Sequence, residues 1–251
     1  MTPRYIFRDP PLSYRIFRGL AYGVGAFIIL TIIAALLLRF VPPITSGVMI
    51  ERYIESQTGD LPFSKNRSKK QSYEQHYHWV PLSKIAPIMG VAVVTSEDQE
   101  FADHFGFDWE AIVKAYEYNQ THRRTRGAST ISQQTAKNLF LWDGRSWIRK
   151  GLEVYFTIVI ETCWSKERIL EVYLNIIEFG DGIYGAEAAA QHYFNKPAAQ
   201  LSTEEAAMLA AVLPNPHVLH ADNPSAYVLE RQTWILNNMH RIGGTEYIKK
   251  L

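Results

Sequence analysis

The chain has 251 residues and a mass of 28.8 kDa, enough for one catalytic domain with an appendage. Hydrophobic residues make up 47% of it and charged residues 20%, which excludes a mainly disordered protein. The single cysteine, Cys163, excludes a disulfide framework, and a net charge of +1 gives no support to nucleic-acid binding.

The first predicted element is an apolar helix over 19–38, without a charged residue. At about 1.5 Å per residue it is roughly 30 Å long, the thickness of a bilayer's hydrocarbon core. A buried soluble helix and a signal peptide are the alternatives. Signal-peptide cores are shorter, and Arg39 and Pro42 follow here instead of a small-residue cleavage site. We therefore interpret 19–41 as an uncleaved transmembrane anchor.

The charges that flank this span predict its orientation. Four arginines precede the span against a single aspartate, whereas acidic and basic residues are mixed after it. The arginines are Arg4, Arg8, Arg15 and Arg18. Because the cationic side of a span stays in the cytoplasm, residues 1–18 are expected to be a cytoplasmic tail. The rest of the chain would then lie outside the cytoplasm, which in a bacterium means the periplasm or the outer face, anchored by one span.

Residues 42–80 are typical of a juxtamembrane connector, because Pro42 and Pro43 end the span and a basic cluster follows. The cluster consists of Lys65, Arg67, Lys69 and Lys70. A solvated loop and attraction to anionic lipid headgroups are the two interpretations of this cluster.

The remaining residues, 81–251, have apolar residues at helical spacing and few strand candidates, which predicts one mainly α domain. Thr130 and Gln133 have the spacing of a capping box at a helix start. Helices are predicted over 85–100, 109–120, 127–138, 148–164, 166–178, 203–213 and 227–241.

The first cluster with candidate chemistry is the carboxylate pair Glu97-Asp98, which follows the apolar run VAVVTS. Carboxylates are rarely placed beside a buried face without a role, so Glu97 is a candidate general base. The alternative is a solvated pair at the end of a helix. His104 has no partner at metal-ligand spacing and is interpreted as structural.

The second cluster follows Gly127 and contains Ser129, Gln134, Lys137 and Asn138. The last three share one helix face, where amides and an ammonium beside a helix start suit an anionic ligand rich in oxygen.

The third cluster contains Arg149, Lys150 and Glu153. An exposed pair four residues apart is worth only about 0.3–0.5 kcal/mol, but Glu153 opens the apolar run LEVYFTIVI, so its exposure is not assured. Two further clusters, over 166–180 and 185–196, are typical of helix packing. A carboxylate with separate cations suits a reaction in which a sugar hydroxyl is deprotonated and a departing diphosphate is neutralised.

Together the five clusters resemble, in order and spacing, the five motifs of the peptidoglycan glycosyltransferases, glycosyltransferase family 51. The resemblance covers about residues 80–215. The matching segments are E-D-x-x-F-x-x-H-x-G at 97–106, G-x-S-T-x-x-Q-Q-x-x-K-N at 127–138, R-K-x-x-E at 149–153, K-x-x-I-L-E-x-Y-L-N at 166–175 and G-x-x-x-A-A-x-x-Y-F at 185–194.

The resemblance implies a mainly α, lysozyme-like glycosyltransferase domain over 81–251. It implies that this domain transfers the growing glycan from its lipid diphosphate to the 4-hydroxyl of N-acetylglucosamine in lipid II, with inversion. Glu97 matches the catalytic base, and Glu153 matches a second essential glutamate. Residues that match substrate-binding positions are Ser129, Gln134, Lys137 and Asn138 at the donor site and Arg149 and Lys150 at the phosphates.

The resemblance implies no obligatory cofactor and no metal held by protein ligands. Mg²⁺ or Mn²⁺ would bind with the substrate diphosphate. The expected partners are lipid II, nascent glycan strands, the membrane and proteins of cell-wall synthesis or division. Transpeptidation is not expected, because S-x-x-K and K-T-G are missing and nothing after residue 251 could hold such a domain. A glycan hydrolase or lytic transglycosylase and a membrane-anchored scaffold are the competing interpretations.

Overall fold

The computed structural model describes residues 11–58, 73–122, 127–144 and 146–251. The chain divides into two compact units, Met1–Val41 and Pro42–Leu251. The flanking charges Arg4, Arg8 and Asp9 lie outside the described residues, as does the basic cluster of the expected connector.

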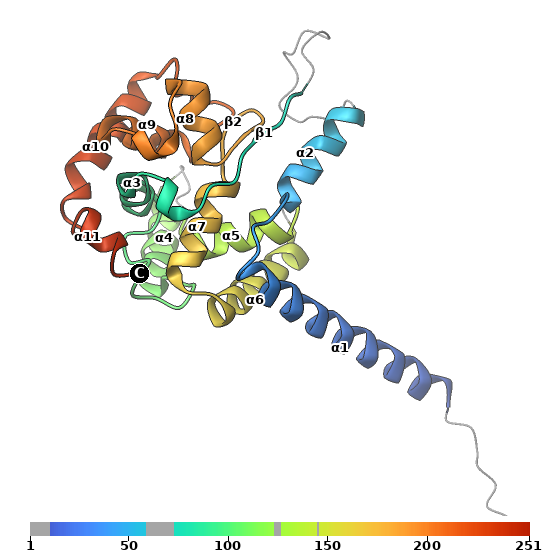
Figure 1. The fold of residues 1–251 in the computed structure, drawn as a ribbon. Helices are drawn as coiled ribbons and strands as arrows, with labels where there is room; N and C mark the ends of the chain where they lie inside the picture. The colour runs from blue at the N-terminus through green and yellow to red at the C-terminus, as the bar shows by residue number, and fades with distance from the viewer. Residues whose placement is uncertain (1–10, 59–72, 123–126, 145) are drawn as a thin grey trace, which may run out of the picture. The chain divides into compact units, whose positions relative to one another are not determined.

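The first unit contains the helix α1 (Leu12–Leu38), drawn in dark blue in Figure 1. It begins seven residues before the predicted span, since nothing after Pro11 interrupts the helix and Arg15 and Arg18 continue it. Its most apolar 18-residue window has a mean hydropathy of 2.5, so it is long and apolar enough to cross a membrane. The Thr31 hydroxyl donates to the Phe27 carbonyl oxygen at 2.9 Å, which satisfies this polar group inside the helix.

The second unit is built mainly of helices, as predicted (Figure 1). The helices are α2 (Gly47–Thr58), α3 (Pro87–Glu97), α4 (Trp109–Thr121), α5 (Ile131–Phe140), α6 (Trp147–Cys163), α7 (Lys166–Ile176), α8 (Ala186–Phe194), α9 (Thr203–Val212), α10 (Ala226–Met239) and α11 (Thr245–Ile248), with short 3-10 turns η2 (Leu82–Lys84) and η3 (Ala198–Gln200).

Helix α2 lies inside the segment expected as a connector and was not predicted as a helix. Its first residue, Gly47, lies against the backbone that follows α5, where a Cβ atom would collide with the Leu141 carbonyl oxygen. Val48 and Met49 are buried, and α2 packs on α5. The segment 42–80 therefore contributes structure to the second unit.

A three-stranded sheet of very short strands was also not predicted from the sequence. It has the order β1-β3-β2, with β1 (His76–Tyr77) parallel to β3 (Ile183–Tyr184) and β2 (Glu178–Gly180) antiparallel to β3. Gly182, with a φ of +76°, forms the turn between β2 and β3. Strands of two or three residues are too short to show alternation of apolar and polar residues.

The helix α3 is the centre of the arrangement that positions the candidate site. Every residue from Met89 to Thr95 is buried, and α3 packs against α9, α10 and α11 (Figure 1). A helix apolar on all sides belongs in a core, so Glu97, the polar residue that ends it, lies where the core meets the surface.

Candidate active site

The adjacent carboxylates Glu97 and Asp98 have different surroundings. The side chain of Glu97 is 13% exposed and that of Asp98 is 2% exposed. Asp98 Oδ2 accepts a hydrogen bond of 2.9 Å from the backbone N–H of Ile131, the first residue of α5, and Asp98 Oδ1 lies 2.9 Å from His104 Nε2. Asp98 therefore ties the start of α5 to the end of α3, and His104 supports it, in agreement with its structural interpretation.

Glu97, in contrast, keeps a partly accessible carboxylate between two helices. Gln134 Nε2 on α5 donates to Glu97 Oε2 at 3.1 Å, and Arg231 Nη2 on α10 donates to Glu97 Oε1 at 3.2 Å. The Ser96 hydroxyl also donates to Oε1, at 2.9 Å. One carboxylate oxygen thus faces α5 and the other faces α10.

The amide of Gln134 is oriented by a buried tyrosine. The Tyr173 hydroxyl on α7 donates to Gln134 Oε1 at 3.0 Å. Burial, followed by the charges of Glu97 and Asp98, raises the pKa of Tyr173 well above its usual value, so this hydroxyl stays protonated. With its oxygen committed to Tyr173, the Gln134 side chain presents its NH₂ group to Glu97.

Arg231 is the functional candidate that sequence reasoning missed. Its guanidinium holds Glu97 and also donates to the Ser96 hydroxyl at 2.7 Å. Arg231 stands 134 residues after Glu97, outside the five matching segments, and no local spacing points to this contact.

The second predicted carboxylate, Glu153 on α6, is buried and paired with cations of its own helix. Glu153 is 4% exposed, its Oε2 lies 2.9 Å from Arg149 Nη1, and its Oε1 is in close contact with Lys150 Nζ. The Arg149 side chain is 12% exposed and that of Lys150 is 43% exposed. This burial rules out the interpretation of Arg149 and Glu153 as an exposed surface pair.

The predicted substrate-binding residues on and before α5 differ in their exposure to solvent. Gln134 and Lys137 are one turn apart and partly accessible, whereas Asn138 is buried. Lys137 Nζ lies 4.0 Å from Asp143 Oδ1. Ser129 is exposed before the helix, and its carbonyl oxygen accepts from Gln134 Nε2 at 3.4 Å. Thr130 and Gln133 form the predicted capping box, which fixes where α5 starts.

Helix α5 connects the two carboxylate clusters. One of its ends carries Gln134 beside Glu97, and its other end packs on α6 through the stacked rings of Phe140 and Phe156, with centroids 4.6 Å apart. Lys137 lies one turn from Phe140, and Glu153 one turn from Phe156. The predicted cations are therefore carried by two helices that pack on each other.

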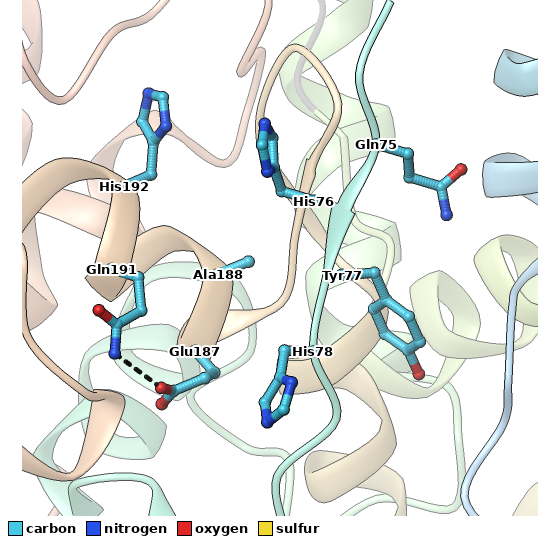
Figure 2. Close-up of a pocket in the computed structure, with 8 residues that line it drawn as sticks. All are labelled: Gln75, His76, Tyr77, His78, Glu187, Ala188, Gln191 and His192. Carbon is cyan, nitrogen blue, oxygen red and sulfur yellow. Dashed lines mark hydrogen bonds between the residues drawn. The ribbon is translucent and has the colours of Figure 1, made fainter.

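A cavity of about 630 Å³ lies elsewhere, between β1 and α8 (Figure 2). Its lining includes none of the predicted site residues; it consists of Gln75, His76, Tyr77, His78, Glu187, Ala188, Gln191 and His192. The acidic member, Glu187, accepts hydrogen bonds from the Ala198 N–H at 2.7 Å and from Gln191 Nε2 at 3.1 Å, so its carboxylate serves packing.

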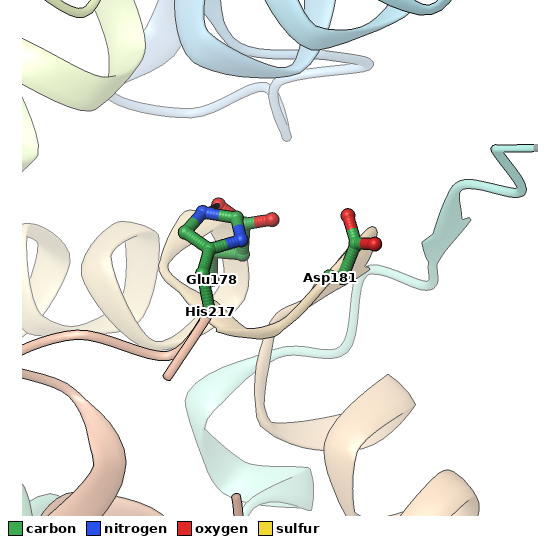
Figure 3. A group of neighbouring side chains, drawn as sticks. All are labelled: Glu178, Asp181 and His217. Atoms are coloured by element: carbon green, nitrogen blue, oxygen red, sulfur yellow. Dashed lines mark ion pairs between the residues drawn. The ribbon is translucent and has the colours of Figure 1, made fainter. Parts of the chain in front are cut away.

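One group of side chains has the composition of a metal site. The ligand atoms of Glu178, Asp181 and His217 lie within 4.8 Å of one another (Figure 3). However, Arg52 Nη2 lies 3.3 Å from His217 Nε2. Burial disfavours charge on Arg52, but the carboxylates of Glu178 and Glu55 outweigh it and raise the pKa of Arg52. A buried guanidinium already neutralises this cluster, which makes it a poor cation site.

Comparisons with known proteins identify the family of the chain. A family model described as Transglycosylase matches residues 64–240. The biosynthetic peptidoglycan transglycosylase of Yersinia pseudotuberculosis serotype O:3 (strain YPIII) is 54% identical over 230 residues, and that of Yersinia pestis (strain Pestoides F) is 53% identical. Each match covers 91% of both proteins.

The chain therefore belongs to the transglycosylase family and is a peptidoglycan glycosyltransferase with a lysozyme-like, mainly α domain. The family resemblance drawn from the five segments is confirmed.

Proposed function

We propose that this peptidoglycan transglycosylase polymerises lipid II. The growing glycan, linked to undecaprenyl diphosphate through N-acetylmuramic acid, is the donor, and the 4-hydroxyl of N-acetylglucosamine in lipid II is the acceptor. A β-1,4 bond forms with inversion, and undecaprenyl diphosphate leaves.

The observation that carries the proposal is the placement of Glu97, partly accessible yet fixed between Gln134 and Arg231. A general base must be held within hydrogen-bond reach of the proton that it removes. Glu97 accepts the proton of the acceptor hydroxyl. The oxygen of that hydroxyl attacks the anomeric carbon of the donor, while the bond from this carbon to the diphosphate oxygen breaks.

The leaving diphosphate needs charge neutralisation rather than a proton. Lys137 on α5 and Arg149 and Lys150 on α6, two helices that pack together, supply cations, and charge-assisted contacts are strongest where negative charge develops. Glu153 holds Arg149 and Lys150 together, so its role in this proposal is to position those cations.

The expected stereochemistry follows from this mechanism, in which Glu97 removes a proton and the cations stabilise the leaving diphosphate. Direct displacement of an α-linked diphosphate by a hydroxyl gives a β linkage without a covalent intermediate. An inverting hydrolase needs a second carboxyl to protonate the leaving oxygen, whereas a diphosphate leaves without one.

The proposed location is the inner membrane of a bacterium, with the N-terminus in the cytoplasm and the catalytic domain in the periplasm. This proposal is supported by α1 and by Arg15 and Arg18 in its first two turns. We keep the division into a tail over 1–18, a span over 19–41, a connector over 42–80 and a catalytic domain over 81–251 as part of the proposal, with α2 and β1 of the connector packed on the catalytic domain.

The proposal includes no transpeptidation, because the sequence has neither S-x-x-K nor K-T-G. Mg²⁺ or Mn²⁺ would enter with the substrate diphosphate rather than at a site of protein ligands. Nascent glycan strands and proteins of cell-wall synthesis or division are the proposed partners.

The experiment that tests this proposal incubates the detergent-solubilised protein with lipid II and, separately, with purified sacculi. Polymer and free undecaprenyl diphosphate are expected from lipid II, with no shortening of the strands in sacculi. Cleavage of sacculi without polymer formation would identify a hydrolase or lytic transglycosylase instead. Absence of both activities would leave a scaffold as the better interpretation.

A further inference from the structure

Helix α10 carries an aromatic face next to the proposed base. Tyr227, Arg231 and Trp234 are spaced by four and three residues, so they lie along one face of the helix. Tyr227 is 41% exposed and Trp234 is 46% exposed. A different face of α10 packs into the core through Val228, Ile235 and Met239.

The contact between Arg231 and Glu97 fixes where this face lies. Arg231 Nη2 is 3.2 Å from Glu97 Oε1, and Tyr227 and Trp234 each stand about one helical turn from Arg231. One turn is roughly 5.4 Å, close to the width of a pyranose ring. The two aromatic side chains are seven residues apart, roughly 10.5 Å along the helix axis, so together they span about the length of a disaccharide.

Resting on the proposed function, we infer that the face formed by Tyr227, Arg231 and Trp234 binds the sugar rings of the acceptor. The face of an aromatic ring carries partial negative charge and attracts the polarised C–H groups on the apolar side of a sugar. The guanidinium between the two rings offers donors to sugar hydroxyl or acetamide oxygens.

The acceptor is assigned to this side because the two oxygens of Glu97 face different helices. Oε2 faces Gln134 on α5, the helix that also carries Lys137. That side suits the sugar that bears the diphosphate. Oε1 faces Arg231, so the sugar that brings the hydroxyl approaches along α10.

A matched control lies on the same helix. Leu229 is 45% exposed, comparable to Trp234, but it stands two residues from Arg231 and so points away from this face. Leu229→Ala removes a similar exposed apolar side chain without touching the aromatic face.

The experiment titrates the full-length protein in detergent with a lipid-free oligosaccharide of alternating N-acetylglucosamine and N-acetylmuramic acid. This probe has no diphosphate and cannot act as a donor, so binding is measured by calorimetry without turnover. Trp234→Ala is expected to weaken binding about tenfold, the equivalent of about 1.4 kcal/mol, and Tyr227→Ala by a smaller factor. Trp234→Phe should restore most of the affinity, and Leu229→Ala should match wild type.

In the lipid II assay, Trp234→Ala and Tyr227→Ala should raise KM for lipid II more than they lower kcat. In ¹⁵N spectra of the wild type, the indole N–H signal of Trp234 should shift when the probe is added. This measurement needs no variant, so it tests the inference even where an alanine variant folds poorly. Unchanged affinity in both alanine variants, or no binding of the probe to wild type, would overturn the inference. If polymerisation were absent while the probe still bound through Trp234, the proposed function would fail and the saccharide site would stand.

Discussion

The two carboxylates of the site, Glu97 and Glu153, are held in opposite ways. Glu97 is fixed by groups 37 and 134 residues away in the sequence, on two other helices. Glu153 is fixed by cations three and four residues before it on its own helix. Glu97 is partly accessible, whereas Glu153 is buried.

This difference separates a site formed by tertiary structure from one formed by helix geometry. Any helix over 147–163 would bring Arg149 and Glu153 together, because residues four apart share a face. The surroundings of Glu97 exist only once α3, α5, α7 and α10 have packed. Distant substitutions should therefore disturb Glu97 more than Glu153.

The largest effect is expected from Glu97→Gln, which removes the base but keeps the size of the side chain. General-base catalysis typically contributes at least about 100-fold, so polymerisation should fall by that factor or more. The fold should stay intact, as measured by circular dichroism and thermal unfolding. Retention of more than a few per cent of wild-type turnover would contradict the role given to Glu97.

The next effect is expected from Glu153→Gln, because it leaves the largely desolvated guanidinium of Arg149, whose side chain is 12% exposed, without its charged partner. Activity should fall by roughly tenfold or more, and stability should fall by about 3 kcal/mol, as measured by denaturant unfolding. Adding Arg149→Gln should recover part of the stability but none of the activity. Near-normal turnover of Glu153→Gln would reduce this cluster to a structural ion pair.

The same contrast explains how much the sequence could predict. The cluster at 149–153 and the capping box at Thr130 are local patterns, and both appear in the structure. The position of Glu97 at the end of a buried helix follows from the apolar run before it. Spacing along one helix is enough to derive these features.

The features that escaped prediction depend on partners far apart in sequence. Nothing near Arg231 indicates that its guanidinium reaches α3, and nothing in 47–58 indicates that α5 covers one side of α2. Asn138 is buried whereas its neighbour Lys137 is partly accessible, and this difference follows from packing rather than from periodicity. Such features follow from tertiary packing, which one sequence does not reveal.

A smaller effect is expected from Arg231→Ala, which tests whether Glu97 depends on its distant partner. Glu97 would lose one of its fixed contacts, so kcat should fall by roughly tenfold, the loss of one charge-assisted hydrogen bond. Arg231→Lys should recover part of kcat by restoring the charge without the planar fork. An Arg231→Ala enzyme with unchanged kcat would show that Glu97 is positioned by α5 alone.

The smallest effect is expected from Tyr173→Phe, which removes only the hydroxyl that orients Gln134. Without this donor the Gln134 amide can turn, so part of the population no longer presents its NH₂ group to Glu97. The loss of one buried hydrogen bond costs about 1 kcal/mol, so kcat should fall by a few-fold. Because the pKa of Tyr173 is raised well above its usual value, the hydroxyl is protonated at every working pH, and the alkaline limb of the rate profile should be the same in wild type and variant.

Tyr184→Phe is the matched control, since Tyr184 is equally buried and its hydroxyl lies 3.2 Å from that of Tyr73, in the small sheet rather than beside Gln134. It should lose comparable stability with unchanged kcat. A double-mutant cycle that combines Tyr173→Phe with Gln134→Ala then distinguishes orientation of the Gln134 amide by Tyr173 from support of Glu97 by packing. If Tyr173 acts through the amide, the two losses in kcat should be strongly non-additive, because the hydroxyl has nothing to orient once the amide is gone. Additive losses would mean that Tyr173 supports Glu97 by packing alone, and the contrast between the two carboxylates would then rest on Arg231.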